Sequence, residues 1–148
     1  HYTPDALSEM EGWLGPNYLY HLQEGEGLGD RLTRSMQWEF RTGCDKLIFL
    51  GGDCPFVDQE RLDEAFAALD TNDVVIGPAM DGGYYLIGIK QSRPELFAGV
   101  DWGTESVCET TLSICEREGF SVALLKEESD VDDLESWQKA KGFIRGND

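Results

Sequence analysis

Four short apolar runs, separated by segments with helical periodicity, limit the folds that this chain of 148 residues can adopt. Each run is rich in Val, Ile, Leu, Phe or Tyr, and they cover 46–50, 73–77, 84–89 and 120–125. Continuous apolar runs of this length are typical of strands buried on both faces of a parallel sheet. Strands that alternate with helices predict an α/β fold with a mostly parallel sheet, and the length predicts one domain over residues 1–148.

The helical segments have their own start and stop signals. Helices are expected over 5–14, 28–41, 58–69, 104–117 and 133–141, and 18–22 is a candidate for a further strand. Within 28–41, Leu32, Met36 and Phe40 fall on one apolar stripe. Asp58 is a candidate N-cap for the helix that follows it, whose inward residues we expect to include Phe66.

The net charge of the chain limits the classes of partner that it can bind. Twelve Lys and Arg against 29 Asp and Glu give a net charge of −17. Such a surface repels nucleic-acid phosphates and anionic lipids, so we expect neither a nucleic-acid nor a membrane partner, although the charge also serves solubility alone. A phosphorylated substrate would then need a divalent cation or a local group of Arg and N–H donors.

The cysteines and the hydropathy indicate the cellular compartment of the protein. Cys44, Cys54, Cys108 and Cys115 have no metal-binding spacing, so we expect reduced thiols in a cytoplasmic protein. No apolar run approaches the roughly 18–20 residues of a membrane span. No His is placed by sequence to activate Cys54, which argues against a nucleophilic role.

In sheets of this kind, ligands bind outside the carboxyl ends of the strands. The first run is followed by Gly51-Gly52-Asp53-Cys54-Pro55, in which two glycines allow close approach of the backbone to a ligand. Asp53 is a candidate ligand for Mg²⁺ or Mn²⁺ on a diphosphate. A turn or a helix cap is the alternative role for this residue.

Two further acidic motifs follow later runs. Asp81-Gly82-Gly83 comes after 73–77, where Gly82 and Gly83 could admit a sugar and Asp81, a candidate catalytic residue, could bind hydroxyls; a tight turn is the alternative. Asp130 and Asp132 follow 120–125 and face the same way on an extended segment. They could complete a metal site with Asp53, or an Asp here could cap the last helix.

A glycine-rich loop and one aromatic residue complete the candidate site. The loop 23–31 leads into a helix, but it lacks the spacing of a dinucleotide fingerprint or a P-loop. Its Gln23 and Gly25, the N–H groups of the helix and Arg31 could hold an anion or a base. Trp102, just before a helix, could stack on a sugar or a base, with a core or lid position as the alternative.

In this order, these pieces resemble the radical-SAM/selenodomain-associated transferase 1 family, a domain of unknown function among the GT-A-type nucleotide-diphospho-sugar transferases. The most specific piece is the run VVIGPAMDGGYYLIG over 74–88. The weaker pieces are Gln23, Gly25, Leu28-Gly29 and Arg31, then 51–55, Leu96-Phe97, Val100-Asp101-Trp102 and 130–134.

The resemblance implies a three-layer α/β/α GT-A fold, a nucleotide-bound donor and glycosyl or nucleotidyl transfer. It also implies that Asp53, with Asp130 or Asp132, holds Mg²⁺ or Mn²⁺, and that 81–83 lies near the acceptor or the sugar. Family members usually open with a strand and a basic loop of the type KxPxxGxxKTRL, which this chain does not contain. We therefore expect the N-terminal βαβ portion to be missing.

Two functions stay open at this point. One is a metal-dependent transferase that takes a nucleotide or nucleotide-sugar substrate. The other is a truncated, non-catalytic GT-A remnant that serves as a binding or interaction module. In both, an unprotected sheet edge and an uncovered apolar face favour a homodimer.

Overall fold

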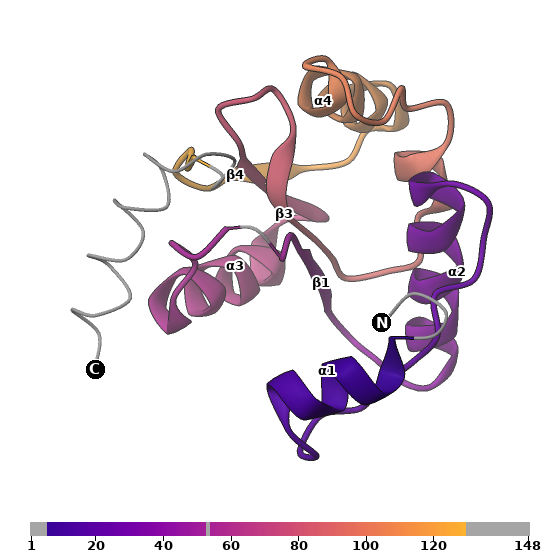
Figure 1. Cartoon of the computed structure of the whole chain (residues 1–148). Coiled ribbons are helices and arrows are strands. Elements are labelled where there is room, and N and C mark those ends of the chain that lie inside the picture. The colour runs from indigo at the N-terminus through magenta and orange to yellow at the C-terminus, as the bar shows by residue number, and fades with distance from the viewer. Residues whose placement is uncertain (1–5, 53, 130–148) are drawn as a thin grey trace.

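The computed structural model of the chain describes residues 6–52 and 54–129 (Figure 1). Its helices and strands match the expected ones closely within these ranges. In chain order they are α1 (Leu7–Leu14), α2 (Leu28–Arg41), β1 (Leu47–Leu50), α3 (Gln59–Thr71), β2 (Val74–Pro78), β3 (Tyr84–Ile89), the 3-10 helix η1 (Pro94–Phe97), α4 (Val107–Glu118) and β4 (Val122–Leu124). The expected helix over 133–141 lies outside the described residues, and 18–22 holds an isolated bridge at Leu22 rather than a strand.

The described strands form one sheet in the order β1-β3-β2-β4. Strand β3 is antiparallel to both β1 and β2, and β2 is parallel to β4. Three of the four strands therefore point the same way, as expected of a mostly parallel sheet, but two of the three pairings are antiparallel. The reason is the short connection 79–83, because a parallel return would need a crossover of a dozen or more residues.

Burial distinguishes two strands that look alike in sequence. Strand β2 is buried along Val74–Gly77, as its apolar run predicts. Strand β1 is only half-buried, and Leu50 is 47% exposed, so the prediction of a central strand buried on both faces is wrong for β1. Among the described strands β1 pairs with β3 alone and lies at the edge of the sheet.

Helices cover both faces of the sheet, which gives the three expected layers (Figure 1). On one face α3 packs Ala65 and Leu69 against Val75 and Leu86. The other face is covered by α2, η1 and α4, and its core comprises Met36, Val74, Ile76, Ile87, Ile89, Leu96, Phe97, Val100, Val107, Ile114 and Cys115. Neighbouring residues of β2 thus face opposite layers, as the period of a strand requires.

Local signals explain where the covering helices lie. On α2, Met36 is fully buried, with Leu32 and Phe40 packed against the same core, which confirms the predicted stripe. Helix α3 begins after Asp58, whose Oδ1 accepts the Arg61 amide at 2.9 Å. The prediction that Phe66 faces inward is wrong: it is exposed, because it lies about 100° around the helix from Ala65.

Two further expectations can be compared with the structure. Cys44, Cys108 and Cys115 are free thiols, and Cys54 and Cys115 are buried. Over the described ranges, no helix combines the length and the apolar character needed to cross a bilayer.

A β-bulge interrupts the start of β3, directly after the turn 79–83. Gly77 lies opposite Leu86, whereas Pro78 lies opposite Tyr84, so Tyr85 is the extra residue. A shift of one residue reverses the side-chain alternation. Tyr84 therefore packs with the core beneath α2 and α4, and Tyr85 packs with Leu86 beneath α3.

Asp73, just before β2, links the starts of β2 and β4. Its Oδ2 accepts the Ser121 hydroxyl at 2.7 Å and the Ser121 amide at 3.0 Å, and Lys90 Nζ lies 3.4 Å from Oδ1. These hydrogen bonds from Ser121, with a smaller contribution from Lys90, hold the pKa of Asp73 below its ordinary value, although burial acts in the opposite sense.

A carboxyl whose pKa is lower in the folded state stabilises the fold above its unfolded pKa, and this contribution is lost as the pH falls through its folded pKa. We expect Asp73→Asn to lower the free energy of unfolding by about 1–2 kcal/mol at neutral pH. The difference from the wild type should shrink below about pH 4. Urea titrations of both proteins at a series of pH values measure it, and a difference that stays constant into the acid range would contradict this origin.

Candidate functional site

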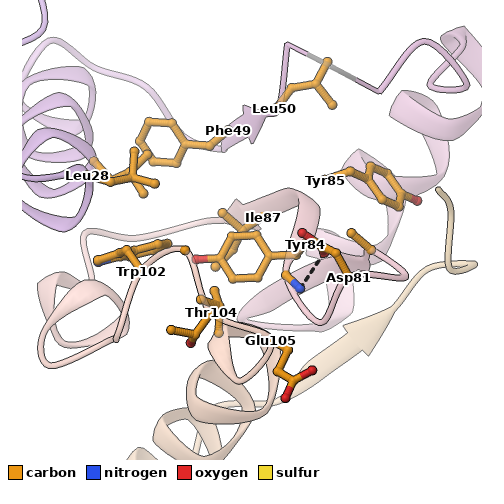
Figure 2. Close-up of a pocket in the computed structure, with 16 residues that line it drawn as sticks. Leu28, Phe49, Leu50, Asp81, Tyr84, Tyr85, Ile87, Trp102, Thr104 and Glu105 are labelled. Carbon is orange, nitrogen blue, oxygen red and sulfur yellow. Dashed lines mark hydrogen bonds between the residues drawn. The ribbon is translucent and has the colours of Figure 1, made fainter. Parts of the chain in front are cut away.

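A cavity of about 520 Å³ opens at the carboxyl ends of β1 and β2. Its residues come from α2, the end of β1, the turn 79–83, β3, the segment before α4 and the first residue of α4 (Figure 2). They are Leu28, Leu32, Phe49, Leu50, Gly51, Ala79, Asp81, Gly83, Tyr84, Tyr85, Ile87, Trp102, Gly103, Thr104, Glu105 and Val107. The cavity lies at the edge where open α/β sheets bind ligands.

Aromatic rings make up much of its wall. The Trp102 ring meets Tyr84 edge to face, with 6.3 Å between the centroids, and lies 6.3 Å from the ring of Phe97. Phe49 in turn packs edge to face on Phe97 at 5.9 Å. Helix α2 approaches this group closely at Gly29, where a Cβ would lie 2.7 Å from Trp102 Nε1. Trp102 is therefore packed between the rings of Tyr84 and Phe97 and the backbone of α2 at Gly29.

The turn 79–83 brings the carboxylate of Asp81 to the cavity. The Asp81 Oδ1 accepts the Gly83 amide at 2.8 Å, and the Ala79 amide donates to the Gly83 carbonyl at 3.0 Å. The Gly82 carbonyl accepts the Cys108 amide from the start of α4 at 2.9 Å. Asp81 thus has the turn role that was the alternative, while its side chain stays exposed on the cavity.

Gly82 cannot carry a side chain in this turn. Its φ of 88° lies in the left-handed region, and an added Cβ would overlap the carbonyl oxygen of Glu105. The segment before α4 is therefore packed directly on the backbone of the turn.

The Tyr84 hydroxyl is buried beneath the cavity and has no hydrogen-bond partner among the described residues. Burial raises the pKa of Tyr84 well above its ordinary value, although the neighbouring Thr111 hydroxyl acts in the opposite sense. Thr111 donates its own hydroxyl proton to the Val107 carbonyl at 2.9 Å. The phenol of Tyr84 therefore stays protonated at any physiological pH.

The structure brings some predicted site residues together and leaves others apart. Asp81, Gly83 and Trp102 line the cavity, and Gly82 shapes the turn beside it. Gln23, Gly25 and Arg31 are not among the cavity residues.

Arg31 Nε donates to the Gly25 carbonyl at 3.1 Å, so the arginine braces the loop before α2. Asp53, Asp130 and Asp132 lie outside the described residues. Across the described ranges, no three His, Cys, Asp or Glu side chains come together as a metal site.

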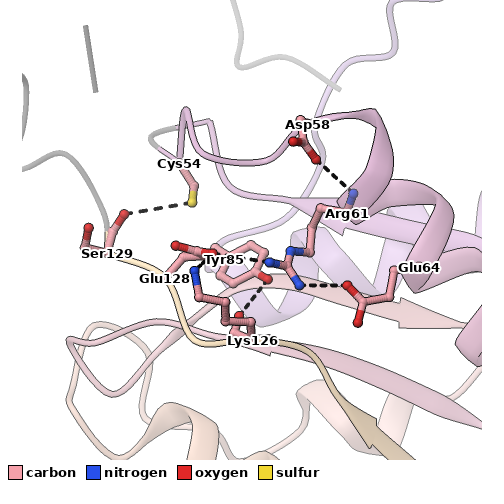
Figure 3. A network of polar contacts seen from close by, with 8 residues as sticks. All are labelled: Cys54, Asp58, Arg61, Glu64, Tyr85, Lys126, Glu128 and Ser129. Carbon is pink, nitrogen blue, oxygen red and sulfur yellow. Dashed lines mark hydrogen bonds and ion pairs between the residues drawn. The ribbon is translucent and has the colours of Figure 1, made fainter. Parts of the chain in front are cut away.

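A second polar cluster ties α3 to the segment after β4 (Figure 3). Arg61 pairs with Glu64 at 2.7 Å and with Glu128 at 3.3 Å, and Lys126 Nζ also reaches Glu128 at 3.0 Å. The Tyr85 hydroxyl donates to the Lys126 carbonyl at 3.0 Å. The cluster fixes the path of the chain just ahead of the predicted ligand Asp130.

Sequence reasoning missed much of the cavity wall, including Leu28, Phe49, Tyr84 and Thr104. The apolar ones read as ordinary core residues in the sequence. One usable signal was present: Gly51 directly follows the apolar run 46–50 and Ala79 lies just after the run 73–77, which places both at the carboxyl edge of the sheet.

Comparison with known proteins identifies the family. Residues 1–104, which include most of the cavity wall, match the family described as "Uncharacterized protein conserved in bacteria (DUF2064)". The chain belongs to this family. None of the curated proteins matches the chain.

A solved structure agrees with the fold. The chain is similar to a provisionally assigned nucleotide-diphospho-sugar transferase from Desulfovibrio desulfuricans G20, whose crystal structure was determined at 1.90 Å. The two are 31% identical with a TM-score of 0.83, and the match covers 97% of this chain and 69% of the other. The domain is therefore GT-A-like and has the fold of the nucleotide-diphospho-sugar transferases.

The Gly82 turn gives a stability prediction. We expect Gly82→Ala to lower the free energy of unfolding by about 3 kcal/mol, since it adds an overlap with a carbonyl to left-handed strain. Gly119→Ala is the matched control, because its φ of 73° is similar but nothing lies within 4 Å of its added Cβ. It should cost about 1 kcal/mol in denaturant titration. Equal losses in the two variants would contradict the close packing on Glu105.

The buried hydroxyl of Tyr84 gives a second stability prediction. Tyr84→Phe removes a buried hydroxyl that has no partner, so we expect the protein to gain about 1 kcal/mol and roughly 2–4 °C in Tm. Tyr85→Phe removes a hydroxyl that donates to Lys126 and should cost about 1 kcal/mol. Scanning calorimetry of the two variants and the wild type measures these changes in Tm. A Tyr84→Phe protein that is less stable than the wild type would mean that the Tyr84 hydroxyl has a hydrogen-bond partner.

Proposed function

We propose that this chain is a metal-dependent GT-A-type transferase that transfers a glycosyl or nucleotidyl group from a nucleotide-bound donor. The observation that carries the proposal is the cavity at the carboxyl ends of β1 and β2, beside Asp81, in a domain with the fold of the nucleotide-diphospho-sugar transferases. The motifs over 74–88 support the narrower assignment to the radical-SAM/selenodomain-associated transferase 1 family. The free thiols of Cys44, Cys108 and Cys115 support a cytoplasmic location.

The residues of the cavity suit the binding and activation of the acceptor in such a reaction. A volume of about 520 Å³ accommodates one small substrate. Asp81 would accept the proton of an acceptor hydroxyl while that oxygen bonds to the donor. The leaving group departs with the electron pair of the broken bond, as the nucleoside diphosphate in glycosyl transfer or as pyrophosphate in nucleotidyl transfer. Trp102 would stack on the sugar or base, and Gly82 and Gly83 keep the backbone of the turn close to it.

The donor half of the proposal depends on residues known from the sequence. Bound Mg²⁺ or Mn²⁺ would neutralise the diphosphate of the leaving group. Asp53, which follows the carboxyl end of β1 in the sequence, and Asp130 or Asp132 are the proposed ligands, and carboxylates are the oxygen donors that these ions prefer. Gln23 and Gly25, in the loop before α2, and Arg31, in the first turn of α2, would contact the nucleotide.

A non-catalytic GT-A-like module that binds ligand and associates as a homodimer is the second candidate. It is supported by the exposed apolar surface of the arm 7–22. Helix α1 buries none of its residues, and Trp13, Tyr18 and Leu19 are 75%, 61% and 87% exposed. Together with the edge strand β1, this surface suits a second copy of the chain.

Calorimetric titration distinguishes the candidates. The wild type is titrated with UDP-, GDP- and CDP-sugars, with and without Mn²⁺. We expect at least one to bind only with Mn²⁺, and Asp53→Ala to weaken that binding by at least about 10-fold. Asp45→Ala is the matched control, since Asp45 is exposed at the opposite end of β1, and should bind like the wild type.

The results of these titrations distinguish the two candidate functions. Binding that is equal with and without Mn²⁺, or equal in Asp53→Ala and the wild type, would remove Asp53 and the metal from the donor site. A folded protein that binds none of the nucleotide sugars would favour the non-catalytic module, and sedimentation would then measure whether it is a dimer.

A further inference from the structure

The cavity is lined unevenly, and this limits what it can bind. Toward α2 and β1 the wall is aliphatic and aromatic, with Leu28, Phe49 and Trp102 facing the hollow (Figure 2). At the rim Leu28 and Leu50 are 48% and 47% exposed. A ligand that covers such a wall removes apolar surface from water, which is the main source of affinity in small-molecule sites.

No positive charge faces this hollow among the described residues. None of their Lys, Arg or His side chains lines it, and Arg31, one turn of α2 beyond Leu28, is bonded to the Gly25 carbonyl. Glu105 lines the cavity, but Figure 2 shows its carboxylate pointing away from the rings of Tyr84 and Trp102. A phosphate or carboxylate on the apolar wall would therefore lose water without gaining a counter-charge.

The polar group on the cavity suits a neutral donor of hydrogen bonds. The Oδ1 atom of Asp81 accepts the hydrogen bond of the Gly83 amide. The side chain is exposed, so its second carboxylate oxygen can accept a hydrogen bond from a ligand. The same negative charge repels an anion. A hydroxyl compound gains a charge-assisted hydrogen bond here.

We propose that this cavity is the acceptor subsite and that it takes an uncharged hydroxyl compound with an apolar ring, rather than a phosphorylated or carboxylated one. The ring lies on Trp102 and Phe49, and a hydroxyl donates to Asp81. The role of the cavity as an acceptor subsite rests on the proposed function, whereas the preference for an uncharged ligand rests on the cavity alone.

The test compares probes that differ by one phosphate. Phenyl β-glucoside, β-galactoside and α-mannoside, and the 6-phosphate of each, are titrated into the full chain by ligand-observed NMR. We expect at least one neutral glycoside to bind at least about 10-fold more tightly than its 6-phosphate. Trp102→Ala should weaken it by about 10-fold. Trp13→Ala, an exposed Trp on α1 outside the cavity, should leave it unchanged.

A gain of charge provides a second test that does not remove a packed ring. Leu28→Lys places a cation on the rim, and we expect it to raise the affinity for the 6-phosphate by about 5- to 10-fold. Leu124→Lys is the matched control, because Leu124 is also an exposed leucine but lies on β4 outside the cavity. It should leave both affinities unchanged.

The proposal is overturned if the phosphorylated probes bind as well as the neutral ones, if no probe binds, or if Trp13→Ala or Leu124→Lys has the same effect as its partner variant. Titrating the same samples with nucleotide sugars and Mn²⁺ separates the two proposals. Neutral glycosides that bind while no nucleotide sugar does would contradict the transferase and retain the preference for an uncharged ligand. The reverse result would retain the transferase and contradict the acceptor class.

Discussion

The arrangement of the molecule depends on strand β3, which lies between β1 and β2 and pairs antiparallel with both. The connection 79–83 is too short for a crossover, so the chain must return directly beside β2. This places the turn with Asp81 next to the carboxyl end of β1. The bulge at Tyr85 then directs Tyr84 to the α2 face, where it forms part of the cavity wall.

Much of the layered fold could be predicted because its signals are local. The stripe of α2, the cap at Asp58 and the buried run of β2 each reflect burial that a short window of sequence reveals. The edge position of β1 could not be predicted, because an apolar run has the same letters whether one or two strands flank it. The bulge at Tyr85 also has no sequence signal, since it follows from the pairing of β2 with β3.

The candidate site was predictable where chemistry coincides with a strand end. Asp81 was identified because its Asp-Gly-Gly motif follows a buried run at the edge where ligands bind, and Trp102 because an aromatic residue just before a helix can stack on a sugar or a base. Phe49 resembled core residues, and only the tertiary structure shows that it faces a hollow. The pairing of Arg61 with Glu128 spans 67 residues of sequence and depends on how α3 and β4 meet, which no local pattern encodes.

The unequal constraint on the two sides of the cavity has a consequence for how its specificity can evolve. The turn is locked, because Gly82 contacts Glu105 and its carbonyl accepts the Cys108 amide. Leu28 and Leu50 on the opposite rim are half-exposed and can change at little cost to folding. Replacement of rim residues on α2 and β1 can thus change the shape and polarity of the cavity while the Asp81 turn stays fixed, so that the two sides of the cavity can diverge independently.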